Sequence, residues 1–144
     1  MNRPWAALGL VLALCVIMPR SAQAQGRRPK PTIGQNYPNP FNPETKADFS
    51  VGEPPTCPDG PSKQYKVTAK VYNVIGQVVA IPVLFGGPSG QGGTPLTNLP
   101  LTCGSYKLRW DGKTLQGREA ASGIYRIVID QDGVKVSIQA VVGK

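Results

Sequence analysis

The residues that could carry out chemistry are eight carboxylates and three cysteines, in a chain of 144 residues that contains no histidine. Without histidine there is no Ser–His or Cys–His pair, in which a neighbouring base activates the nucleophile. A pair of carboxylates is the remaining option, because an acid and a base of this type can hydrolyse a glycosidic bond. The carboxylates are scattered along the chain: Glu44, Asp48, Glu53, Asp59, Asp111, Glu119, Asp130 and Asp132.

Three of these carboxylates directly precede glycine, which favours a role in turns. Asp59, Asp111 and Asp132 each begin an Asp-Gly pair, and such pairs are typical of tight turns. The glycine-rich segment 86–93 lacks the Gly-Lys-Ser/Thr that ends a phosphate-binding loop. We therefore predict no catalytic residue, no cofactor and no metal site, and we expect the protein not to be an enzyme.

The N-terminal residues have the features of a signal peptide. Arg3 precedes an uninterrupted apolar run over 6–18, and Ala22-Gln23-Ala24 fits a small-x-small cleavage site. We predict a signal peptide over 1–24 with cleavage after Ala24, and no membrane span in the mature chain. An uncleaved anchor and a lipoprotein lipidated at Cys15 are the alternatives. The expected location is the periplasm, the cell surface or the medium.

Removing 24 of the 144 residues leaves 120, enough for one domain. The formal charge falls from +8 to +6, because Arg3 and Arg20 are removed. Residues 25–32 are basic and proline-rich, so we expect a disordered lead-in there and a domain over 33–144. The mature chain keeps Cys57 and Cys103, and two cysteines in an oxidising compartment predict one disulfide. Two free thiols are the alternative.

The remaining sequence alternates between apolar and other residues with the period of two that strands show. We expect strands at 46–51, 65–74, 77–84, 105–110, 124–129 and 134–142, irregular structure over 85–95, and a loop or edge strand over 96–101. About seven short antiparallel strands without a convincing helix predict an all-β, Ig-like β-sandwich. The expected core is Phe49, Val67, Val71, Tyr106, Leu108, Trp110, Tyr125, Ile127, Val136 and Ile138.

The segment 35–43, QNYPNPFNP, interleaves asparagine and proline around Tyr37 and Phe41. Proline fixes φ and moves the preceding residue out of the α region, so the segment cannot be helical. We predict an extended, turn-rich clip (residues 35–43) that both aromatic side chains anchor to the domain. A proline-rich linker is the alternative, although such linkers favour small polar residues.

The clip sequence resembles the opening of the type IX secretion C-terminal sorting domain and of the related Ig-like domain of the flagellar hook-cap protein. Two further blocks at suitable spacing extend the resemblance over roughly 33–144: VYNVIGQVV from Val71, and Trp110-Asp111-Gly112 followed by Ser122-Gly123-Ile124-Tyr125. The motif residues are Asn36, Tyr37, Pro38, Asn39, Pro40, Phe41, Asn42, Pro43, Tyr72, Gly76, Trp110, Asp111, Gly112, Gly123 and Tyr125.

The resemblance implies recognition by outer-membrane secretion machinery, followed by attachment to the cell surface. In that family the last strand and tail carry recognition, and the matching residues here are Val136, Ile138, Val141, Val142 and Lys144. The alternative is a free-standing periplasmic or surface module that binds another envelope protein or a glycan. A nucleic-acid partner is not expected, because the predicted basic faces lack interleaved aromatic residues.

Overall fold

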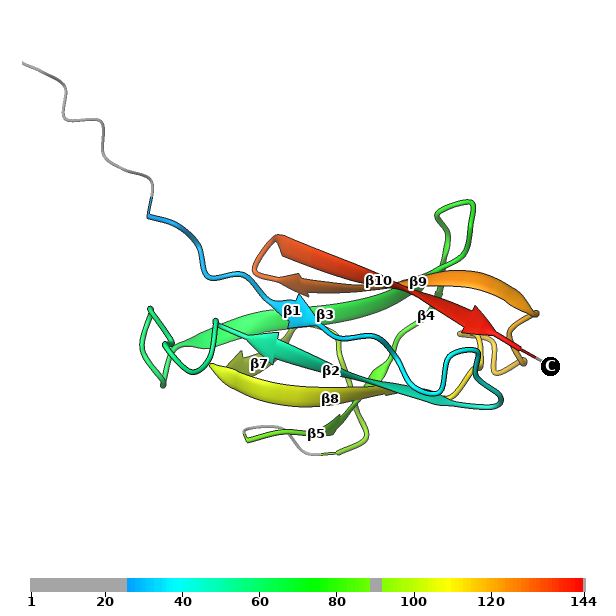
Figure 1. Ribbon diagram of the computed structural model, residues 1–144, viewed down its shortest axis with the longest axis horizontal. Coiled ribbons are helices and arrows are strands. Elements are labelled where there is room, and N and C mark those ends of the chain that lie inside the picture. The colour runs from blue at the N-terminus through cyan, green and yellow to red at the C-terminus, as the bar shows by residue number, and fades with distance from the viewer. Residues whose placement is uncertain (1–25, 89–91, 144) are drawn as a thin grey trace, which may run out of the picture.

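The computed structural model describes residues 26–88 and 92–143, which fold into a sandwich of two antiparallel sheets (Figure 1). The all-β prediction is confirmed. The predicted signal peptide and Lys144 lie outside the described residues. Within the described ranges we find no helix with the length and apolarity needed to cross a membrane.

Each sheet joins strands that are distant in sequence. The first sheet has the order β1-β2-β8-β5-β6 and the second the order β10-β9-β3-β4, with β7 also paired to β3. The first sheet comprises β1 (Thr32–Ile33), β2 (Thr45–Val51), β8 (Gly104–Trp110), β5 (Val83–Gly86) and β6 (Thr94–Pro95). The second comprises β10 (Val134–Val142), β9 (Gly123–Gln131), β3 (Gln64–Tyr72), β4 (Val78–Ala80) and β7 (Leu99–Thr102).

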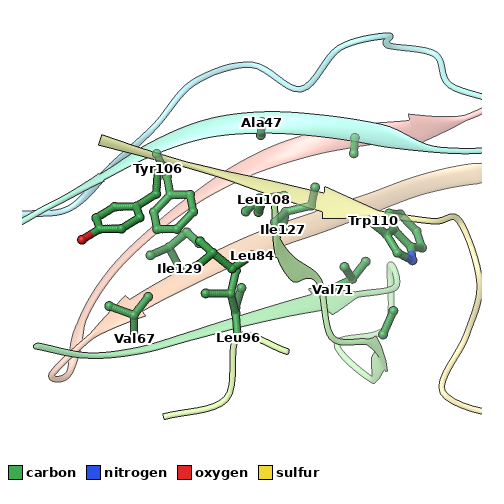
Figure 2. Close-up of a cluster of buried hydrophobic side chains, with 14 of the residues drawn as sticks. Ala47, Val67, Val71, Leu84, Leu96, Tyr106, Leu108, Trp110, Ile127 and Ile129 are labelled. Carbon is green, nitrogen blue, oxygen red and sulfur yellow. The ribbon is translucent and has the colours of Figure 1, made fainter. Parts of the chain in front are cut away.

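The core lies between the two sheets and follows the predicted alternation. Tyr106, Leu108 and Trp110 of β8 are buried, and Ile127 of β9 packs from the opposite sheet (Figure 2). The other expected core residues divide into two groups. Phe49, Val67 and Val71 are buried, whereas Tyr125, Val136 and Ile138 are partly buried against the core.

The expected strand over 77–84 is wrong, because the chain changes sheets within it. β4 ends at Ala80 in the second sheet, and β5 begins at Val83 in the first. Pro82 lies at the crossing, where it has no N–H to give to a ladder, and its carbonyl accepts the Leu96 N–H at 3.0 Å. Leu84 in β5, after the crossing, and Leu96, which follows β6, are both buried in the core (Figure 2). The alternation did not predict either of them as a core residue. The segment 85–95 is also less irregular than expected, since it contributes the end of β5 and all of β6.

The described part of the predicted lead-in contacts the domain. Pro29 is buried, and its carbonyl accepts a 2.9 Å hydrogen bond from Nε2 of Gln131. Oε1 of the same glutamine, which is 2% exposed, accepts the Gly52 N–H at 2.8 Å. Arg27 pairs with Glu53 at 2.9 Å. Gln131 therefore gives the predicted lead-in a buried hydrogen-bond partner that the composition of the segment does not reveal.

The predicted disulfide between Cys57 and Cys103 is present, with Cα atoms 5.9 Å apart and a sequence separation of 46 residues. In the chain-entropy model, closing a loop of this length stabilises the fold by about 4 kcal/mol. Near this bond, the Tyr65 hydroxyl donates to Oδ2 of Asp59 at 2.9 Å. Burial, and then this carboxylate, raise the pKa of Tyr65 to about 12.

Candidate functional site at the edge of β10

Phe41 brings the clip into contact with the third motif block. Its side chain is 1% exposed, and its ring meets Trp110 edge to face with centroids 5.1 Å apart. Trp110 meets Tyr125 in the same way at 5.3 Å, and its Nε1 donates to the Lys113 carbonyl at 3.0 Å. The first and third blocks therefore form one aromatic cluster of Phe41, Trp110 and Tyr125 at one end of the sandwich.

Asp111 and Gly112 shape the turn that follows Trp110. Oδ1 of Asp111 accepts the Lys113 N–H at 3.0 Å, which supports the predicted turn role. Gly112 has a φ of +74°, and a Cβ atom at this position would lie 2.1 Å from the Pro43 carbonyl oxygen. Only glycine therefore lets the end of the clip approach this turn.

The start of the clip is held by a buried polar network. Asn36 is 2% exposed, and its Nδ2 donates to Oγ1 of Thr45 at 3.0 Å. The Thr45 hydroxyl in turn donates to the Pro38 carbonyl at 2.9 Å. Backbone bonds between Tyr37 and Lys46, at 2.8 and 3.0 Å, continue the β2 pairing into the clip. The network satisfies polar groups whose burial would otherwise be costly.

Tyr37 is not the second anchor that we predicted. It is 45% exposed, and its hydroxyl accepts a hydrogen bond from Nζ of Lys107 at 3.2 Å. This bond, followed by the Asp48 carboxylate, raises the pKa of Lys107. The prediction failed because the pairing with Lys46 directs the Tyr37 side chain to the outer face of the first sheet.

The clip also bonds to the edge strand β10. The Phe41 N–H donates to the Val141 carbonyl at 2.9 Å, and the Gly143 N–H donates to the Phe41 carbonyl at 3.0 Å. Oδ1 of Asn39 accepts the Val141 N–H at 3.0 Å, and Nε2 of Gln35 donates to the Gln139 carbonyl at 3.2 Å. Both backbone groups of Val141 that face away from β9 are thus satisfied by the clip.

The first half of β10 has an open edge. Antiparallel partners alternate between hydrogen-bonded and non-bonded pairs, and Val141 directs its backbone groups toward the clip. Lys135, Ser137 and Gln139 therefore also direct their backbone N–H and C=O groups away from β9. Among residues 26–88 and 92–143, no backbone partner outside the ladder bonds Lys135 or Ser137. The clip closes one half of this edge. β1 also contacts β10, but among the described residues no backbone hydrogen bond closes the other half.

The second motif block lies away from this cluster. Tyr72 ends β3, and Oδ1 of Asn73 accepts the Ile75 and Gln77 N–H groups at 3.2 and 2.9 Å to close the β3–β4 turn. Gly76 completes the turn with a φ of +80°.

The remaining motif and tail residues follow the strands. Gly123 begins β9, and Pro38, Pro40, Asn42 and Pro43 belong to the clip. Of the tail residues in β10, Val142 is buried and Val136, Ile138 and Val141 are partly buried. Lys144 is outside the described residues.

Sequence reasoning missed the roles of three polar residues: Gln35 and Thr45, which bond the clip, and Gln131, which bonds Gly52 and Pro29 at the opposite end of β9. A signal existed for Gln131, which occupies an inward position of a strand after Ile127 and Ile129. Among the described residues, no three carboxylates or cysteines gather closely enough to hold a metal ion. What this arrangement offers chemically is strand pairing along an exposed backbone edge.

No family model matches the chain, and neither does any curated protein. PorZ, described as an essential bacterial surface component of the type-IX secretion system of Porphyromonas gingivalis, aligns with a TM-score of 0.42 and 14% identity, over 76% of this chain and 11% of that one. Dimeric latent PorU from the same organism aligns with a TM-score of 0.49 and 16% identity, over 81% of this chain and 10% of that one. The chain thus spans about a tenth of either protein, and at these values the likeness indicates nothing about activity.

Proposed function

We propose that the protein is an exported, non-catalytic Ig-like domain whose strand β10 is recognised by outer-membrane secretion machinery. The three sequence blocks that resemble a sorting domain support this proposal. The observation that carries it is the pair of bonds between the clip and Val141, which fixes one half of the β10 edge. Recognition would be followed by attachment at the cell surface.

The open half of β10 supplies a mechanism for this recognition. An exposed edge strand can accept a further strand, whose main-chain hydrogen bonds provide affinity and whose alternate side chains provide specificity. The outward groups of Lys135 and Ser137 are available for this pairing, whereas those of Val141 are occupied. The clip would thereby define the register at which a partner strand ends.

The Cys57–Cys103 disulfide supports the exported location, because disulfides persist in oxidising compartments. The periplasm, the cell surface and the medium all satisfy this condition. The proposed partner is a component of the secretion machinery, or another envelope protein that presents a free strand.

The proposal predicts that Ser137→Pro strongly reduces surface delivery while the fold is kept. Proline at this position removes an outward N–H and leaves the β9 ladder intact, and edge strands tolerate such a proline. A reporter should be fused ahead of Gly26, because Pro29 and Pro31 are packed against the domain. In a host with a working type IX translocon, we expect surface display to fall about tenfold or more, as for the loss of a central interaction.

Ser137→Ala is the matched control, because it removes the side chain hydroxyl and keeps the N–H. It should display the reporter as well as the original domain does. Thermal unfolding of all three domains checks that Ser137→Pro is folded. Equal display of a folded Ser137→Pro domain, or no display of the original one, would sink the sorting role.

A free-standing interaction module is the second candidate. It is favoured by a hollow on the outer face of the second sheet, on the opposite side of the strands from the core.

A further inference from the structure

The outer face of β3, β9 and β10 is hollowed. One hollow has a volume of about 730 Å³, and an adjoining one has about 260 Å³. Both are lined by Tyr72, Val128 and Lys135, so they form one continuous groove (the outer-sheet groove). A groove of this size can hold several side chains of a bound segment.

One wall of the outer-sheet groove is aliphatic. Figure 1 shows the β3–β4 turn, drawn in green, projecting past β9 and β10. Val74 and Ile75 at this turn are 79% and 73% exposed, and Ile124 at the start of β9 is 48% exposed. Val74 and Ile124 both line the groove, next to Tyr72. Exposed apolar residues gathered in one place mark interaction surfaces more often than residues scattered singly.

The register of the three strands places basic side chains around the apolar ones. Tyr72 of β3 is paired with Arg126 of β9, and Arg126 is paired with Gln139 of β10. Two residues earlier in β3, Lys70 is paired with Val128 of β9. Lys135 is aligned with Asp130, whose Oδ1 accepts the Gly133 N–H at 2.7 Å. The charged residues that line the groove are therefore three cations and one carboxylate: Lys70, Arg126, Lys135 and Asp130.

These cations differ from those of the first sheet. There, Lys107 pairs with Asp48 at 3.3 Å and Arg109 approaches Glu44 at 3.9 Å. Among the described residues, the three cations of the groove have no carboxylate within ion-pair distance. The groove is thus an apolar surface with uncompensated positive charge.

We infer that the outer-sheet groove binds an acidic segment of another protein that also carries a large apolar side chain. Its carboxylates would meet Arg126 and the two lysines, as electrostatic complementarity requires. Its apolar side chain would be buried between Tyr72, Val74 and Ile124. A glycan lacks such a side chain, and a second copy of this chain that docked through the same positive face would be repelled.

The test is an NMR titration of the isotope-labelled domain with a short synthetic peptide that alternates glutamate and leucine. We expect shifts centred on β9 and the β3–β4 turn, and binding that weakens with added salt. Arg126→Gln should weaken the affinity about tenfold, as expected for loss of a charge-assisted contact, and Ile124→Ser should do likewise. Lys107→Gln, on the first sheet, should bind the peptide normally.

Further probes decide between the possible occupants. A peptide with lysine in place of glutamate, one with serine in place of leucine, and an oligomer of glucuronic acid should each bind more weakly. Binding of the uronate oligomer as tight as that of the peptide would overturn the inference, and so would unchanged affinity in Arg126→Gln. Arg126 and Ile124 both lie on β9. The outcome for Arg126→Gln and Ile124→Ser therefore does not depend on the open edge of β10.

Discussion

Trp110→Ala is expected to lower the free energy of unfolding by about 3–5 kcal/mol, the range for truncating a large buried aromatic side chain. Trp110 is 1% exposed and lies between the rings of Phe41 and Tyr125, so its loss removes both edge-to-face contacts. It also removes the hydrogen bond to the Lys113 carbonyl. Denaturant unfolding measures the loss, which is large compared with the stability of a domain of this size.

Trp110→Phe is the control for this substitution. Phenylalanine keeps an aromatic ring between Phe41 and Tyr125 and removes the indole N–H, so a clearly smaller loss is expected. If Trp110→Ala unfolded at the denaturant concentration of the original domain, the aromatic cluster would not hold the clip.

Gly112→Ala is expected to cost about 2–5 kcal/mol, the sum of left-handed backbone strain and overpacking. The φ of Gly112 is +74°, and a Cβ atom would lie 2.1 Å from the Pro43 carbonyl oxygen. That neighbour is backbone, so the end of the clip would have to move. The measurement is again denaturant unfolding.

Gly117→Ala separates the two contributions to this cost. Gly117 has a φ of +80° but nothing within 4 Å of its Cβ position. Gly117→Ala should therefore lower the free energy of unfolding only by the backbone strain, about 1–2 kcal/mol. Equal costs at Gly112 and Gly117 would mean that the clip does not pack against the turn after Trp110.

The sequence was sufficient to predict the strands whose faces alternate cleanly. The Asp132-Gly133 pair gave the β9–β10 hairpin, and the apolar positions of β8 gave its buried face. The sheet change at Pro82 was not predictable in the same way, because proline indicates an interruption and not where the chain continues. Leu84 and Leu96 were missed as core residues for that reason.

The candidate site was predicted in part. Phe41, Trp110 and Tyr125 were assigned from motifs that lie far apart in the sequence, and the structure brings them together. Tyr37 was misassigned, because a turn-rich segment has no fixed period from which to infer the direction of a side chain. The bonds from the clip to Val141 depend on how the two sheets pack, which no local pattern encodes.

Hydrogen exchange along β10 tests most directly whether the clip closes one half of this edge and leaves the backbone groups of the other half without a partner. After correction for intrinsic rates, the Val141 and Gly143 amides should be protected, since they bond to Asn39 and Phe41. The Ser137 amide should exchange on the order of a hundredfold faster than that of Ile138, which faces β9. Ser137 protected as strongly as Ile138 would contradict the open edge, and with it the proposed recognition site.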